Sequence, residues 1–135
     1  MMTLRISLRN GEQMIVNGAL LRAVGRTELC IENTVTVLRG REVMAPEDAT
    51  TPARRLYHAC MLAYIDPAGA AAHHDEIIGY LEGLIGALES HEAKAACAAF
   101  AQKVAIGDFY RALADCRTLI TYETVAFARA ECDAA

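Results

Sequence analysis

The spacing of apolar residues in this chain of 135 residues changes its period near residue 50. Before that point apolar and polar residues alternate, as in TLRISLR at 3–9, so every second side chain would lie on one face of a strand. Beyond it, apolar residues recur every three or four positions, as at 75–89, which is typical of an amphipathic helix. Because the two periods occupy separate blocks, we expect an α+β fold in which a sheet is followed by helices.

The first block, residues 1–50, predicts a small antiparallel β-sheet. Its strand-like segments are separated by turn residues, including the pair Asn17-Gly18, which suits a two-residue hairpin because both central residues need positive φ. We expect the strands to follow one another as a meander that ends with TVTVLRG at 34–40.

The second block, residues 51–135, predicts a bundle of about four helices that packs with the sheet as one domain. Thr51 is a suitable N-cap, and Pro52 occupies the first helical position, where its missing N–H costs little. A stop at Gly107 separates the last two helices. The last helix is expected to carry one apolar stripe on one side, formed by Phe109, Leu113, Cys116, Ile120 and Phe127.

Three glycines, Gly79, Gly83 and Gly86, recur at helical spacing within the second predicted helix. Each glycine in a helix interior costs about 1 kcal/mol relative to alanine. Two interpretations remain open. The glycines permit close approach by another helix, as in a partner or dimer interface, or they are tolerated in a short or bent helix.

Motifs of catalysis are missing from the sequence, which contains no glycine-rich phosphate loop, GxSxG turn or HExxH. The cluster HHDE at 73–76 is a weak metal candidate, since adjacent helical histidines point in different directions. We therefore expect no enzyme, no cofactor and no metal site. The cysteines are odd in number, lack a CxxC pair and are expected to be reduced: Cys30, Cys60, Cys97, Cys116 and Cys132.

Apolar runs are too short to span a membrane, and the N-terminal residues lack the apolar core of a signal peptide. A cytoplasmic location without membrane contact is expected from both features and from the reduced thiols.

Arginine is concentrated at one end of the chain. Residues 1–55 contain eight arginines and six acidic residues, a balance of +2, whereas residues 56–135 contain five basic and eleven acidic residues, a balance of −6. The guanidinium fork suits phosphate and stacks on bases. We expect one strand face to carry both Arg5 and Arg9, and another to carry both Arg39 and Arg41. The candidate RNA-binding residues are Arg5, Arg9, Arg39, Arg41, Arg54 and Arg55. The alternative is that these arginines are only the solvated rim of a two-part fold.

Several segments resemble the FlbT family of flagellin-biosynthesis regulators, namely IVNGA at 15–19, LCIEN at 29–33, VLRGREVMAPEDATTPARRLYHACMLAYID at 37–66 and GDFYRALADCRTLITYE at 107–123. The resemblance implies a cytoplasmic post-transcriptional regulator that binds the 5′ untranslated leader of flagellin mRNA. Such a regulator would control translation and stability of the message, as a repressor in some species and positively in others. It also implies FlaF as a protein partner, leaves a homodimer possible and supplies no catalytic residues.

Two classes of function follow from these expectations. The first is the RNA-binding regulator. The second is an interaction adaptor or chaperone of the flagellar system that acts through FlaF or flagellin without touching RNA. A fainter resemblance links 4–12 and 38–43 to strands of carbon-storage-regulator RNA-binding proteins, and there the contacts would be Arg5, Arg9, Arg39 and Arg41.

Overall fold

The structure is a computed structural model that describes residues 4–33 and 35–134, the last four by their backbone only. Its residues form two compact units, here called the sheet unit (Met1–Val43) and the helical unit (Met44–Ala135). Five β-strands followed by four α-helices confirm the predicted α+β class.

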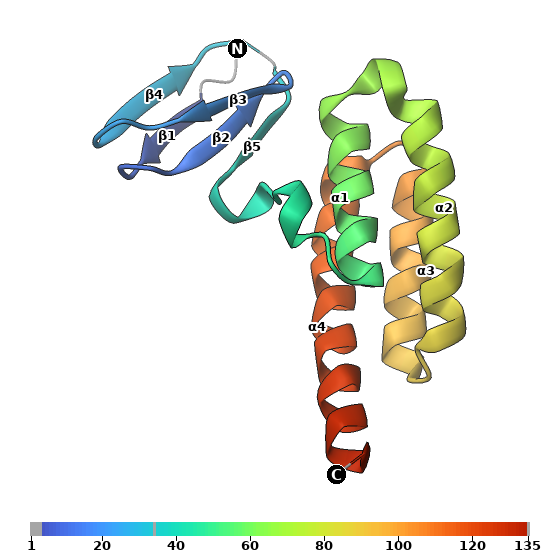
Figure 1. Cartoon of the computed structure of the whole chain (residues 1–135). Coiled ribbons are helices and arrows are strands. Elements are labelled where there is room, and N and C mark those ends of the chain that lie inside the picture. Colours follow the sequence, from blue (N-terminus) through green and yellow to red (C-terminus); the bar gives the residue numbers. More distant parts are fainter. Residues whose placement is uncertain (1–3, 34, 135) are drawn as a thin grey trace. The chain divides into compact units, whose positions relative to one another are not determined.

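The sheet unit contains two antiparallel sheets (Figure 1). One pairs β1 with β4, and the other has the order β3-β2-β5. The five strands are β1 Leu4–Leu8, β2 Gln13–Val16, β3 Ala19–Arg22, β4 Thr27–Ile31 and β5 Val37–Arg39. The predicted Asn17-Gly18 hairpin is confirmed: it joins β2 to β3, with φ of 49° and 84° at its central residues.

The predicted meander is wrong, because β1 pairs with β4 and not with the strand that follows it. Two small sheets can cover each other's apolar face, which one flat meander cannot do. A buried cluster of Ile6, Leu8, Met14 and Ala23 lies between strands of both sheets. Within β1 the alternation follows the prediction, since Ile6 and Leu8 are buried.

Strand β5 is shorter than predicted and ends at Arg39. Gly40 has a φ of 56°, and a 3-10 turn, η1, follows at Gly40–Glu42. Arg41 therefore lies in this turn, so the prediction that Arg39 and Arg41 share one strand face is wrong. Residue 34, the expected start of this strand, lies outside the described residues.

The helical unit contains the four predicted helices. Thr51 caps the first of them: its Oγ1 accepts a hydrogen bond from the backbone N–H of Arg54, with 3.3 Å between nitrogen and oxygen. Helix α1 packs against α2 and α4, and α3 packs against α4. The α-helices are α1 Pro52–Ile65, α2 Ala70–Ala87, α3 His91–Ala105 and α4 Phe109–Ala134, and the short 3-10 turns are η2 Pro46–Asp48 and η3 Pro67–Gly69.

The core of this unit buries side chains from all four helices, among them Leu56, Ile77, Phe100 and Leu119. Three cysteines, Cys60, Cys97 and Cys116, are buried there as free thiols, as small apolar residues would be. The side chain of Cys132 is not among those described.

One carboxylate is buried among these apolar residues. Glu123 of α4 is 4% exposed, and its Oε2 accepts the N–H of Ala53 at 2.8 Å. This N–H belongs to the first turn of α1, which has no partner within its own helix. The partial positive charge of the helix end stabilises the buried carboxylate, and Glu123 thereby fixes α1 against α4.

The predicted apolar stripe of α4 is not buried along its whole length. Phe127, the last residue of the stripe, has a side chain that is 50% exposed. Helix α4 has 26 residues whereas α3 has 15, and its last turns extend past the α2–α3 connection (Figure 1). Since no helix of the unit reaches as far, the stripe loses its neighbours before Phe127.

The three glycines of α2 lie on an exposed surface. A Cβ added at Gly79, Gly83 or Gly86 would meet no atom within 4 Å. Close packing against the described residues therefore does not explain these glycines, and the predicted interface stays a prediction.

Among the described residues, no helix combines the length and the apolar character needed to cross a membrane.

Candidate nucleic-acid interface

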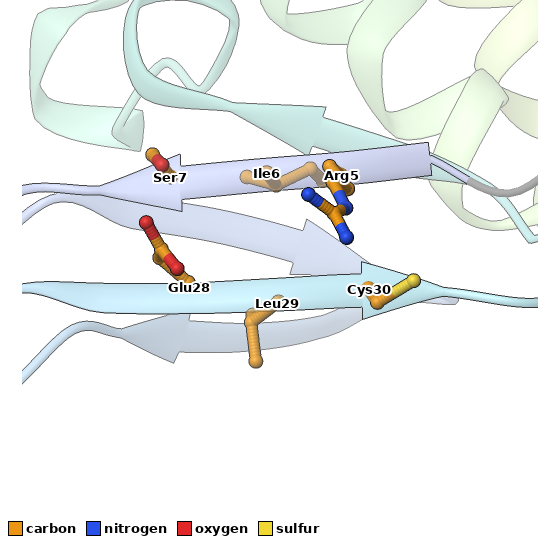
Figure 2. Close-up of a pocket in the computed structure, with 6 residues that line it drawn as sticks. All are labelled: Arg5, Ile6, Ser7, Glu28, Leu29 and Cys30. Atoms are coloured by element: carbon orange, nitrogen blue, oxygen red, sulfur yellow. The ribbon is translucent and has the colours of Figure 1, made fainter.

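The outer face of the β1–β4 sheet gathers polar side chains from both strands. Arg5 pairs with Cys30 and Ser7 pairs with Glu28, so these four side chains lie on one face, while Ile6 is buried on the other. Figure 2 shows the Arg5 guanidinium and the Glu28 carboxylate between the two strands. The face is hollowed here by a shallow depression of about 410 Å³.

A second depression of about 550 Å³ continues this face beyond the end of β1. Ser7 lines both depressions, which makes the surface continuous. Arg9 and Arg26 line the second depression together with Asn10 and Glu12. We call the surface formed by Arg5, Ser7, Arg9, Arg26, Glu28 and Cys30 the arginine face.

Hydrogen bonds hold the two loops of the arginine face together. The Gly11 N–H donates to the Ala23 carbonyl at 2.7 Å, and the Gly25 N–H donates to Asn10 Oδ1 at 2.8 Å. Glu12 Oε1 accepts the N–H of Arg9 at 3.1 Å, which closes the turn after β1. The backbone positions of Arg9 and Arg26 are therefore fixed before any ligand arrives, which lowers the entropy cost of binding.

The guanidinium groups on this face are free of partners within the part of the chain that the structure describes. None of the side chains of Arg5, Arg9 and Arg26 makes an ion pair or hydrogen bond with a described residue. Each guanidinium has five N–H donors in a planar fork that matches phosphate. Three such groups along one surface can bind an extended polyanion.

Arg39 and Arg41 flank the Gly40 turn, which touches the edge of the arginine face. A Cβ at Gly40 would lie 3.1 Å from Glu12 Oε2, so this backbone passes close to the Glu12 carboxylate. Both arginines are exposed. The chain thus brings them beside the turn of Arg9, although not onto a common strand.

Arg54 and Arg55 lie elsewhere, in the first turn of α1 in the helical unit. Arg54 is half-buried and Arg55 is exposed. The six predicted residues are therefore divided between two units, with four in the sheet unit and two in the helical unit.

Arg26 is one of the basic residues of the first block that could neutralise phosphate, but the sequence did not place it beside Arg9 or among the six candidate residues. Leu8 pairs with Thr27, so the pairing of β1 with β4 brings the residues just beyond each strand end together. Alternating residues in TELCI at 27–31 did indicate a strand, but they could not show which strand it pairs with.

The described residues contain no group of three or more His, Cys, Asp or Glu side chains placed to hold a metal ion. In the HHDE segment, His73 Nε2 lies 3.2 Å from Asp66 Oδ2. That contact joins the start of α2 to the turn before it. Burial lowers the pKa of His58, an effect opposed by the negative charge of Glu76 and reinforced by His73.

Comparison with known proteins identifies the chain. The family model described as "Flagellar protein FlbT" matches residues 4–127, which is most of both units. The chain belongs to the FlbT family. No solved structure matches it.

Three relatives within the FlbT family match over 81–94% of their own length. A "Probable flagellum biosynthesis repressor protein FlbT" from a Caulobacter species is 35% identical over 123 residues, covering 90% of this chain and 94% of the relative. The "Flagellum biosynthesis repressor protein FlbT" of Caulobacter vibrioides is 34% identical, covering 90% and 87%. A relative from Agrobacterium fabrum is 35% identical, covering 90% and 81%. These names describe regulation, not catalysis.

Proposed function

We propose that this FlbT-family chain regulates flagellum biosynthesis by binding the 5′ untranslated leader of a flagellin mRNA. Binding there would control translation and stability of the message, because a protein on the leader obstructs ribosome entry and alters nuclease access. The observation that carries the proposal is the arginine face, on which the guanidinium groups of Arg5, Arg9 and Arg26 have no partner among the residues that the structure describes.

The shape of the face suits single-stranded RNA. It is a shallow, open surface on a two-stranded sheet, whereas the narrow major groove of an RNA duplex excludes most protein elements. Phosphates would lie against Arg5, Arg9 and Arg26, where charge attracts them. Glu28 lies among these arginines and can accept hydrogen bonds from base N–H groups, so unpaired bases would turn toward β4.

The test is fluorescence anisotropy with labelled leader RNA at several salt concentrations. We expect salt-dependent binding that exceeds binding to a scrambled leader. Replacing both Arg9 and Arg26 with alanine should reduce the slope of log affinity against log salt by about 1.4, since each single-strand phosphate contact contributes about 0.7. A maleimide adduct on Cys30 should block binding sterically, because that thiol is exposed on the same face.

The matched control is Arg111→Ala, which removes an exposed arginine of the helical unit that pairs with Asp108 at 3.6 Å. This variant should bind RNA with the unchanged slope. The double variant Arg54→Ala with Arg55→Ala measures the contribution of the helical unit separately. Folded protein that shows no leader-selective binding would refute the proposal, as would an unchanged slope after loss of Arg9 and Arg26.

A second candidate function is that of a protein-interaction adaptor that acts through FlaF or flagellin. It is favoured by the exposed surface of α2, where Ile78 and Ile85 are 38% and 44% exposed beside Gly79, Gly83 and Gly86. The acidic balance of the helical unit would also repel RNA. Under this alternative, the unmodified protein captures purified FlaF and does not bind the leader RNA, and Gly83→Leu abolishes the capture of FlaF.

A further inference from the structure

The end of α4 and the α2–α3 connection form a groove in the helical unit that is lined by both apolar and polar residues. The groove has a volume of about 700 Å³, and its α4 side is formed by Thr121, Tyr122, Val125, Ala126, Arg129 and Ala130. Every described side chain of α4 from Thr124 to Ala130 is exposed. An isolated helix end of this length is marginally stable in water, so packing against an apolar partner would stabilise it.

The two walls of the groove carry opposite charges. Glu89 and Glu92 lie on the side of the α2–α3 connection, and Arg129 lies on the side of α4. None of the three makes an ion pair with a described residue. An occupant that fits the groove must therefore bring apolar side chains, a cation for the glutamates and an acid for Arg129.

We propose that the occupant is the end of α4 from a second copy of this chain. The α4 end of each copy then lies along the other copy's groove, which makes the protein a two-fold symmetric dimer. In an antiparallel arrangement, Val125 of each copy packs against the other copy's helix. Ala126 and Ala130 are small and permit the two helices to approach closely. Arg129 of each copy then lies against Glu89 and Glu92 of the other.

Self-complementarity is the reason to choose a second copy over another protein. A two-fold interface uses the same surface on both partners, so that surface must carry its own charge complement. This groove does, with two acids on one wall and an arginine on the other. Because the contact involves only helix ends and connections, we expect a dissociation constant on the order of 1–100 µM.

Sedimentation velocity of the full chain across a concentration series tests the proposal. We expect a monomer–dimer equilibrium that Val125→Glu weakens by about tenfold or more, because it buries a carboxylate in the apolar contact. Arg129→Glu should weaken the dimer as well, and adding Glu89→Arg to it should restore part of the affinity. Such a charge-swap rescue is not expected from a merely structural role of either residue.

Phe127→Glu is the matched control, since Phe127 is a similarly exposed apolar residue of the same helix that does not line the groove. Its dimer should be unchanged, and circular dichroism should show native helix in every variant. Three results would overturn the proposal: a monomer at all concentrations up to several hundred micromolar, a dimer insensitive to Val125→Glu, or a dimer dissolved by Gly83→Leu instead, which would place the contact on α2.

Discussion

The sheet unit and the helical unit differ in net charge and in how their basic side chains are paired. The sheet unit contains six arginines and four glutamates, a net charge of +2, and none of its arginine side chains is paired with a described residue. The helical unit contains seven basic and thirteen acidic residues, a net charge of −6. There Lys103 pairs with Asp115, Arg111 pairs with Asp108, and Arg117 donates to the Tyr57 hydroxyl.

This difference in the pairing of arginine side chains indicates that the two units have different roles. An arginine that binds a neighbour stabilises its own fold, and part of its hydrogen-bonding capacity is used. An arginine without such a partner keeps its donors for a ligand and contributes little to stability. The sheet unit is therefore the better candidate for binding an anion, and the helical unit for structural support and protein contact.

The largest expected contrast between the units concerns their thiols. Burial raises the pKa of Cys60 to about 12, and burial also raises the pKa of Cys97 and Cys116, whereas Cys30 is exposed on the arginine face. Since the thiolate is the reactive form, Cys60 should react with iodoacetamide about a thousandfold more slowly than an ordinary thiol at neutral pH. Peptide mass spectrometry of the native protein should find Cys30 alkylated and these three thiols protected.

Unfolding in guanidinium is the control for this experiment, because all five cysteines of the chain should then react at similar rates. Rapid alkylation of Cys60 in the native protein would show that the helical core opens often, and the contrast between the units would fail.

The next largest effect is expected in the helical core. Phe100→Ala should lower the free energy of unfolding by about 3–5 kcal/mol, because Phe100 is 0% exposed and its loss leaves a cavity. Phe127→Ala in the same unit should change it by less than about 0.5 kcal/mol, since that ring is half exposed. Urea denaturation followed by circular dichroism measures both, and equal losses would contradict the exposed position of Phe127.

The smallest effect compares an engaged arginine with an unpaired one. Arg117 donates to the Tyr57 hydroxyl at 3.2 Å and lies 5.8 Å from the centre of its ring. Arg117→Met should therefore lower stability by about 1 kcal/mol. Arg26→Met should change stability by less than about 0.5 kcal/mol while weakening RNA binding. If Arg26→Met were the more destabilising of the two, the division of roles between the units would be wrong.

The sequence by itself determined the features that depend on neighbouring residues. The fold class follows from the change of hydrophobic period, and the hairpin follows from Asn17-Gly18. The start of α1 follows from Thr51 and Pro52. In each case the deciding interactions join residues a few positions apart, such as a cap with the third residue after it. The resemblance to the FlbT family likewise rested on contiguous runs of residues, above all the run at 37–66, and the family comparison confirms it.

Only the tertiary structure decided which distant segments meet. Alternation of apolar and polar residues predicts a strand, but it does not say which other strand pairs with it. Any neighbouring strand would do if the apolar face were covered, so the pairing of β1 with β4 could not be predicted from the pattern. That pairing places Arg26 beside Arg9 and Cys30 beside Arg5. Helical spacing placed Phe127 on an apolar stripe, but whether a stripe is buried depends on how far the neighbouring helices extend. Helix α4 continues past them, and its exposed end is decided by the lengths of other helices.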